Sequence, residues 1–304
     1  MQNVSLNILR TDRPDPGQYP GGRKPSWLKM KMPAGEGYAR LKKMVADKRL
    51  HTVCESAKCP NIGECWASGT ATLMILGDVC TRSCGFCHIK TGRPPELDTD
   101  EPVRVGEAVA FMNLGHVVIT SVNRDELKDG GAEIWAETIR QIRIQSPGTS
   151  VEVLIPDFCG KWEALQRVID ERPEILNHNI ETVPSQYRRV RPQAKYHRSL
   201  KLLQICKEAG LTTKTGMMLG IGEQGHEIES VMDDLVAINL DILTLGQYLQ
   251  PTPRHLPVDR WVTPEEFAAW KQAGEDKGLR HVESGPLVRS SYHAERQVQA
   301  HAAV

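Results

Sequence analysis

Three cysteines stand close together in the stretch CTRSCGFC, at Cys80, Cys84 and Cys87. Thiolates are the soft ligands that iron–sulfur clusters take, and this C-x3-C-x2-C spacing lets three of them wrap one corner of a cubane. The fourth iron then has no protein ligand, and an open position on a metal is typical of a site that does chemistry. A zinc site is the alternative, with the neighbouring His88 as its fourth ligand. The spacing favours an open [4Fe–4S] cluster.

A second cysteine triplet lies just upstream, in the stretch CESAKCPNIGEC, at Cys54, Cys59 and Cys65. Taken alone, its C-x4-C-x5-C spacing also suits a structural zinc ion or a plain redox cluster. The chain has eight cysteines, and six of them fall within residues 54–87. Such clustering in a chain of 304 residues indicates metal binding rather than a disulfide framework.

The elements that must hold these cysteines alternate between short apolar strands and amphipathic helices from residue 71 onward. The strands are predicted at 71–78, 116–122, 150–156, 174–180, 212–219 and 240–246, and the helices at 103–115, 132–145, 161–171, 195–210 and 227–239. This order predicts an α/β fold, namely a partial (open) TIM-type barrel of about six βα units. No G-x-G-x-x-G motif follows the first strand, which argues against a dinucleotide-binding fold.

The barrel is predicted to span residues 71–262, within one integrated catalytic domain. Residues 1–70 are predicted as an N-terminal extension that carries the second triplet, and residues 263–304 as a C-terminal helix and extension. Both extensions are expected to cover the cluster end of the barrel. CTRSCGFC follows the first strand directly, so it should lie at the C-terminal rim, where barrel enzymes place their chemistry.

The stretch VTPEEF predicts the start of the C-terminal helix. Thr263 is the expected N-cap, Pro264 takes the first helical position, and Glu266 completes a capping box. The helix should run to about Lys277, where Gly278 ends it, and a last strand follows at 279–284.

Several residues outside the triplets are expected to have a structural role, or have two possible roles that the sequence leaves open. Cys206 shares a helical face with Leu202 and Leu203, so we expect it in the core. Cys159 lies in a loop after the third strand, as a free thiol at the rim. Lys214, in the fifth strand, faces either the barrel interior or solvent. Two interpretations are open for the stretch YRRVRP, which contains Arg188, Arg189 and Arg191: a solvated loop, or a contact for an acidic partner or a carboxylate.

Charge and hydropathy argue against several classes of protein. Lys and Arg number 38, as do Asp and Glu, so the balance does not favour nucleic acid as a partner. The longest apolar runs, such as LMIL and VVIT, are too short to cross a bilayer. The first residues, MQNVSLNILRTDRPDPG, contain no apolar core segment, so no secretory signal is predicted. We expect a cytoplasmic protein with no membrane partner.

Further motifs accompany the two triplets in a fixed order. HTVCESAKCPNIGECW and CTRSCGFCHI are followed by TSVNRDELKDGGA, NHNIETV, GQYLQPT, HLPV and RSSY. Together they resemble the lipoyl synthase family of the radical S-adenosylmethionine superfamily, over about residues 25–295. That family inserts two sulfur atoms, at C6 and C8 of an octanoyl chain that is amide-linked to a lysine of a lipoyl carrier protein. The resemblance therefore implies a sulfurtransferase that makes the lipoyl group.

The resemblance also implies roles for residues around the first triplet. In the superfamily, the open iron of such a cluster is chelated by the amino and carboxylate groups of S-adenosylmethionine. One electron then cleaves this cosubstrate, and the resulting 5′-deoxyadenosyl radical takes hydrogen from unactivated carbon. Phe86, next to the last cysteine, matches the superfamily motif and is expected beside the cosubstrate. Asn179 and Glu181, at the end of the fourth strand, are expected at its methionine or ribose.

For the upstream triplet, the resemblance implies an auxiliary [4Fe–4S] cluster that is consumed as the sulfur donor. Its ligands would be the three upstream cysteines and Ser290, the first serine of RSSY. The catalytic residues are then the three cysteines of CTRSCGFC together with Ser290. Two clusters per chain and two molecules of S-adenosylmethionine per product are implied. The chain departs from the family at Asn123, where an acidic residue is common.

The resemblance implies three kinds of partner. They are an octanoylated lipoyl carrier (a dehydrogenase E2 domain or the glycine-cleavage H protein), a reduced ferredoxin- or flavodoxin-type electron donor, and an iron–sulfur carrier that rebuilds the spent cluster. Two alternatives remain at this point. One is another radical enzyme with two clusters, such as a methylthiotransferase or a biotin synthase. The other is a non-catalytic iron–sulfur or zinc protein that only binds a partner.

Overall fold

The computed structural model describes residues 24–28, 50–52 and 70–291. One sheet of eight strands runs through it in the order β1-β2-β5-β6-β7-β8-β9-β10. β1 pairs antiparallel with β2, and every later pair is parallel. The strands are β1 (His51–Thr52), β2 (Thr70–Ile75), β5 (His116–Ser121), β6 (Ser150–Leu154), β7 (Ile175–Asn177), β8 (Thr213–Leu219), β9 (Ile242–Gln247) and β10 (His281–Gly285). Within the described ranges β1 and β10 do not pair with each other, so the sheet is open.

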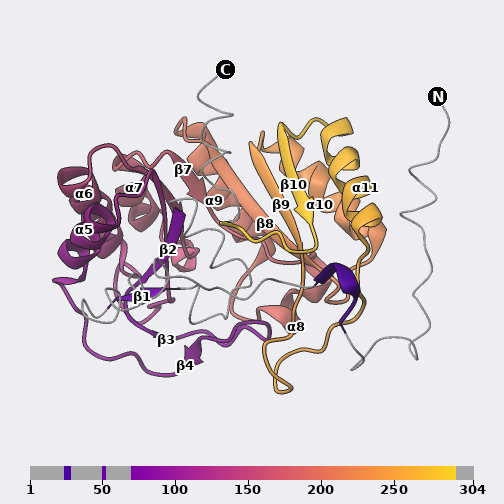
Figure 1. Ribbon diagram of the computed structural model, residues 1–304, viewed down its shortest axis with the longest axis horizontal. Coiled ribbons are helices and arrows are strands. Elements are labelled where there is room, and N and C mark those ends of the chain that lie inside the picture. The colour runs from indigo at the N-terminus through magenta and orange to yellow at the C-terminus, as the bar shows by residue number, and fades with distance from the viewer. Residues whose placement is uncertain (1–23, 29–49, 53–69, 292–304) are drawn as a thin grey trace.

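Helices connect the parallel strands and lie on the outside of the curved sheet (Figure 1). They are α5 (Glu101–Met112), α6 (Ala132–Gln145), α7 (Trp162–Asp170), α8 (Tyr187–Val190), α9 (Tyr196–Glu208), α10 (Gly225–Ala237) and α11 (Pro264–Asp276), with short 3-10 turns η1 (Ser26–Leu28), η2 (Phe158–Gly160) and η3 (Pro184–Gln186). Six strands from β2 to β9 are each followed by a helix, which confirms the predicted partial barrel. No helix in the described ranges is long and apolar enough to cross a membrane.

The C-terminal helix begins as the sequence predicted, with one difference in its cap. Thr263 Oγ1 accepts a hydrogen bond from the backbone nitrogen of Glu266 at 3.2 Å, and Pro264 occupies the first turn. The Glu266 carboxylate does not complete a capping box. It accepts instead from the Arg260 guanidinium at 2.7 Å, in a charge-assisted hydrogen bond, and from the Trp270 indole at 3.3 Å. β10 then pairs with β9, so the C-terminal part extends the barrel sheet.

Side chains alternate between two environments along each strand. On β5, Val117 and Ile119 pack in an apolar core between the sheet and its helices. Leu243 and Leu245 do the same on β9, in a second core cluster. The residues between these apolar ones face the other side of the curved sheet, which is the barrel lumen, and many of them are polar.

The lumen contains a fully buried charged pair. Lys214 Nζ lies 3.0 Å from the Glu152 carboxylate, and both side chains have no solvent exposure. Asn177 Nδ2 donates to the same carboxylate at 2.9 Å, and His116 Nε2 lies 3.8 Å away. Lys214 therefore faces the barrel interior and not solvent, the two orientations that the sequence had left open.

Candidate functional site

The loop that carries CTRSCGFC leaves β2 through a strained turn. Leu76 and Gly77 both have positive φ, at 68° and 88°. Buried charges hold the Leu76 peptide on both sides, because its nitrogen donates to Glu101 at 2.6 Å and its oxygen accepts from Arg124 at 3.1 Å. A two-stranded parallel ribbon of β3 (Val79–Cys80) and β4 (Lys90–Thr91) then closes the base of the loop. The loop leaves the sheet in a fixed direction at the carboxyl end of β2.

The three cysteines of this loop fit an iron–sulfur cluster. Cys80, Cys84 and Cys87 are free and half-buried. Cys80 Sγ accepts two backbone N–H groups, from Arg82 at 3.4 Å and from Asn123 at 3.3 Å, as cluster sulfurs commonly do. Burial raises the pKa of the free Cys84 thiol to about 12 and that of Cys87 to about 11. Thiols in such surroundings need a cation, such as iron, to become thiolates.

The described geometry offers no support for the zinc alternative. In the part of the chain that the structure describes, no three His, Cys, Asp or Glu side chains converge as the ligands of one metal ion. The described part includes the first triplet and His88, the set that zinc would need. In a cubane each thiolate binds a different iron atom, so the cysteines need not meet at one point.

Segments from the far half of the barrel pack against the cysteine loop. The Gly85 nitrogen donates to the Val190 oxygen at 2.9 Å, and the Gly85 oxygen accepts from the Leu256 nitrogen at 3.0 Å. His255 Nε2 lies 3.0 Å from the Cys87 oxygen. Phe86 packs against a small apolar cluster at this rim, formed by Val190, Ile221 and Tyr248. Figure 1 shows β3, β4 and α8 along the same lower end of the barrel.

Asn179 and Glu181, the two residues predicted at the cosubstrate, lie beside Ser290. Asn179 Nδ2 is 2.8 Å from Ser290 Oγ and 3.1 Å from Glu181 Oε1. Ser290 Oγ is also 3.1 Å from Asn179 Oδ1. Burial raises the pKa of Glu181, while nearby Arg191 opposes that rise. The fold therefore brings together residues that are 111 positions apart in the sequence.

The upstream triplet, Cys54, Cys59 and Cys65, lies outside the described residues. The two scattered cysteines are both described. Cys206 is fully buried in the core, as predicted. Cys159 is an exposed thiol in η2, which follows β6, as its place in a rim loop indicated.

Comparisons with known proteins decide the family. The sequence model of the radical SAM superfamily matches residues 74–235, more than half of the chain, and the N-terminal domain of lipoyl synthase matches residues 16–59. The lipoyl synthase of Rubrobacter xylanophilus is 59% identical over 278 residues, covering 91% of this chain and 87% of its own length. The mitochondrial lipoyl synthase of Nematostella vectensis is 52% identical over 299 residues, covering 98% and 100%.

The chain belongs to the lipoyl synthase family. It is accordingly a radical S-adenosylmethionine sulfurtransferase, an enzyme class that uses an iron–sulfur cluster and S-adenosylmethionine. Its reaction inserts sulfur at C6 and C8 of a carrier-bound octanoyl chain and gives the lipoyl group. The alternatives of another two-cluster radical enzyme and of a non-catalytic metal protein are thereby set aside.

Two solved structures share the barrel fold. Streptococcus suis SuiB bound to its precursor peptide SuiA superposes with a TM-score of 0.58 at 11% identity, over 80% of this chain and 52% of that one. Methylornithine synthase superposes with a TM-score of 0.50 at 13% identity, over 88% and 89%. At these identities the similarity concerns the fold alone.

Arg191, one of the three arginines of the stretch YRRVRP, lies at the site. Its side chain is 8% exposed and donates to the Asn179 oxygen at 2.5 Å. It also lies over the Tyr187 ring, and its charge lowers the pKa of Cys84 against the larger effect of burial. The sequence grouped it with two neighbouring arginines. Both of these are exposed, and the Arg189 guanidinium donates to the Ile221 oxygen beside the site.

A buried glutamate shapes the rim at the end of β8. The Glu223 carboxylate accepts from the nitrogens of Gly220 at 2.7 Å and Ile221 at 2.9 Å. Burial raises the pKa of Glu223, and Arg260 opposes this from 3.5 Å. The two glycines of this GIGE turn, Gly220 and Gly222, have φ values of 86° and 116°. Ile221, which lies between these two glycines, contributes its side chain to the apolar cluster beside Phe86.

Proposed function

We propose that Cys80, Cys84 and Cys87 hold a [4Fe–4S] cluster whose fourth iron is left to S-adenosylmethionine. The observation that supports this best is a loop at the carboxyl end of β2 with three half-buried thiols, one of which accepts two amide N–H groups. When bound, the cluster and the cosubstrate supply the one-electron chemistry that starts hydrogen abstraction from unactivated carbon. The loop's own contribution is to fix the three sulfurs and to screen them partly from water.

The proposal gives the residues around the loop distinct tasks. Arg191 and Glu181 offer a cation and a carboxylate close to Cys84, which suits the carboxylate and amino groups of a bound amino acid. The amide of Asn179 is in reach of the same place and of Ser290. Phe86 and its apolar neighbours offer a dry wall for a flat ring. These groups would hold the cosubstrate in one orientation.

A second cluster is proposed on Cys54, Cys59, Cys65 and Ser290, as the source of the inserted sulfur. Two observations support it. The N-terminal lipoyl synthase domain matches residues 16–59, which include the first two of these cysteines. The Ser290 hydroxyl is held by the side chain of Asn179, next to the proposed place of the cosubstrate. A serine oxygen is a harder ligand for iron than a thiolate, which suits a cluster that must release an iron atom.

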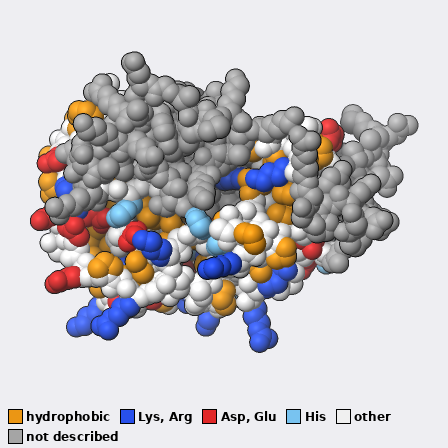
Figure 2. All heavy atoms as spheres, turned by 60° about the horizontal axis from the view of Figure 1, so that its bottom comes forward, with side chains coloured by type: hydrophobic (Ala, Val, Ile, Leu, Met, Phe, Trp, Pro, Cys, Tyr) orange, Lys and Arg blue, Asp and Glu red, His pale blue; other side chains and the backbone are white. Residues whose placement is uncertain are grey.

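The acidic lipoyl carrier is proposed to bind a basic surface next to the cysteine loop. Residues 182–207 contain seven Lys and Arg and no Asp or Glu, although the whole chain has no net charge. Arg188, Lys195 and Lys201 are exposed in this segment. Figure 2, which brings the lower end of Figure 1 forward, shows Lys and Arg side chains spread over the uncovered part of this face. The proposal includes a ferredoxin- or flavodoxin-type electron donor and an iron–sulfur carrier as further partners, in the cytoplasm.

An anaerobic assay tests the proposed function. The protein is reconstituted with iron and sulfide, then mixed with S-adenosylmethionine, a reductant and an octanoyl-lysine peptide. We expect about eight iron and eight sulfide atoms per chain, and a peptide heavier by two sulfur atoms with about two 5′-deoxyadenosines per product. Cys84→Ala should abolish deoxyadenosine formation, whereas Cys206→Ala, which also removes a thiol but in the core, should not. Deoxyadenosine without sulfur insertion would overturn the role of the second cluster.

A further inference from the structure

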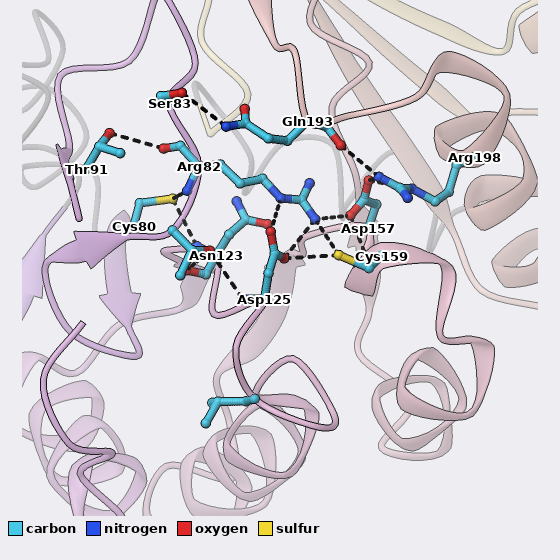
Figure 3. A network of polar contacts seen from close by, with 12 residues as sticks. Cys80, Arg82, Ser83, Thr91, Asn123, Asp125, Asp157, Cys159, Gln193 and Arg198 are labelled. Atoms are coloured by element: carbon cyan, nitrogen blue, oxygen red, sulfur yellow. Dashed lines mark hydrogen bonds and ion pairs between the residues drawn. The ribbon is translucent and has the colours of Figure 1, made fainter. Parts of the chain in front are cut away.

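Arg82 stands inside the cysteine loop, between Cys80 and Cys84, yet its side chain points away from the cysteines into a buried polar network (Figure 3). The guanidinium is 4% exposed. It makes a forked contact to Asp125, with Nε at 2.6 Å and Nη2 at 2.9 Å from the two carboxylate oxygens. Nη2 also donates to Asp157 at 2.6 Å. One arginine therefore ties the loop after β2 to the loops after β5 and β6.

The network returns to the cysteine loop by a second route (Figure 3). Asp157 also pairs with Arg198 of α9 at 2.6 Å. Arg198 Nη2 donates to the Gln193 oxygen at 3.0 Å, and Gln193 Nε2 donates to Ser83 Oγ at 3.1 Å. Two neighbouring residues of the loop are thus held by one ring of contacts: Arg82 by the two aspartates, and Ser83 by Gln193. Four loops at the rim meet in this ring.

The charges in this ring alternate and balance. Two arginines face two carboxylates, so the network adds no net charge beside the cysteines. Forked arginine–carboxylate contacts fix a side chain in distance and in angle, which a lysine does not achieve. The exposed Cys159 thiol completes the contacts, accepting from Arg82 at 3.2 Å and donating to Asp125 at 3.3 Å. The geometry is that of an anchor rather than of a binding pocket.

The residue that the fork anchors, Arg82, also donates a backbone hydrogen bond to the Cys80 sulfur. The backbone nitrogen of Arg82 itself donates to Cys80 Sγ, and the Asn123 nitrogen that donates to the same atom belongs to the loop that carries Asp125. Hydrogen bonds to sulfur stabilise the reduced, more negative state of an iron–sulfur cluster and so raise its reduction potential. The fork therefore sets the position of two of the groups that tune the cluster.

We propose that Arg82 is a positioning residue, which anchors the cysteine loop to β5 and β6 and thereby sets the reduction potential of the cluster. The effect of Arg82 on the reduction potential rests on the proposed cluster, whereas its anchoring of the loop concerns the protein without a cluster.

Arg82→Gln removes the fork and one charge, and Arg82→Lys keeps the charge but loses the fork. The double change Arg82→Gln with Asp125→Asn keeps the charge balance without the fork. Arg140→Gln is the control, since Arg140 likewise pairs with carboxylates, three in its case and two for Arg82, but lies on the outer helix α6.

Two measurements test this proposal. The first is amide hydrogen exchange of residues 81–87 in the metal-free protein, which we expect to become about tenfold faster or more in all three Arg82 variants. The second is a redox titration of the reconstituted cluster followed by electron paramagnetic resonance. At a fixed solution potential the ratio of reduced to oxidised cluster should fall about tenfold, equivalent to about 59 mV for a one-electron couple. The Arg140 control should change neither quantity.

The outcomes separate the possible causes. If Arg82→Lys and the double variant have the wild-type potential, the network acts through its charge and the positioning role is overturned. Wild-type exchange rates in all three Arg82 variants would overturn the anchor directly. If the wild-type protein takes up no cluster at all, the proposed function fails. The exchange comparison would still decide whether Arg82 holds the loop. Should Arg82→Gln fail to fold, Asp125→Asn alone removes one arm of the fork at a half-buried position and takes its place.

Discussion

Replacing Lys214 with methionine should destabilise the barrel strongly, because it leaves a buried carboxylate without its cation. Lys214 and Glu152 are both fully buried and 3.0 Å apart. Removing one partner of such a pair typically costs about 3–5 kcal/mol, since the remaining charge has lost its compensation in a medium of low dielectric constant. Asn177 Nδ2 still donates to the carboxylate at 2.9 Å, so we expect a loss near the lower end of this range.

The double variant Glu152→Leu with Lys214→Met isolates the charge from the packing. It leaves no buried charge, and the main remaining defect is the Asn177 amide without its acceptor, worth about 1–3 kcal/mol. Urea unfolding of the metal-free protein, followed by circular dichroism, measures both variants. We expect the single variant to be the less stable of the two. If the double variant loses as much stability as Lys214→Met or more, the ion pair does not account for the effect.

The same pair predicts how the loss of stability in Lys214→Met depends on pH. Burial raises the pKa of Glu152, but Lys214 and His116 oppose this and the net shift is downward from 4.5. In the wild type this carboxylate therefore contributes stability that is complete above about pH 4.5 and is lost as the pH falls through its folded value. In Lys214→Met its folded pKa should rise instead, so the folded state holds a proton that the unfolded state releases. The difference between variant and wild type should grow from about pH 5 to about pH 8, and a difference that shrinks would refute the argument.

Three further predictions concern the proposed site. Ser290→Cys should keep the iron content of both clusters but slow sulfur insertion, because a thiolate releases its iron less readily; full activity would remove the idea. Arg191→Gln should weaken S-adenosylmethionine binding about tenfold or more through the loss of a charge-assisted contact, with unchanged iron content. Equal affinity would place Arg191 outside the cosubstrate site. Arg188→Glu with Arg189→Glu should weaken binding of the octanoylated carrier, measured by titration calorimetry, without changing iron content; unchanged affinity would move the docking surface elsewhere.

The barrel was predictable because each of its strands carries its own pattern. The core strands read as short runs of Val, Ile and Leu, and the helices between them carry one apolar face. The ribbon of β3 and β4 was not predicted, because two strands of two residues each leave no periodicity to detect. The predicted capping box was half right: Thr263 caps the helix, but the Glu266 side chain does not bond back to the cap. Arg260 and Trp270 donate to Glu266 instead, and these contacts depend on tertiary packing, which the sequence motif does not show.

The cysteines of the site could be predicted from the sequence because their spacing is local, whereas the contacts of the two buried arginines beside them could not. Arg82 meets Asp157 across 75 positions. Arg191 looked like part of an exposed basic run, although it turns into the barrel mouth. One rule would have found two of these residues. Asp125 and Asp157 each follow a predicted strand within a few positions, where a barrel collects its functional side chains. Asn179 was predicted because it stands at the end of the fourth strand.

Two glycines explain how the C-terminal segment can reach the barrel mouth at all. A Cβ atom on Gly246 of β9 would lie 2.2 Å from the Val288 oxygen, so only glycine lets this backbone cross so closely. A Cβ atom on Gly216 of β8 would lie 3.0 Å from Ser290 Oγ and 2.8 Å from the Asn179 side chain. Neither glycine is needed for an unusual backbone conformation; both are needed for space. Ser290 can thus meet Asn179 in the lumen because the two strands between them present no side chain where the segment passes.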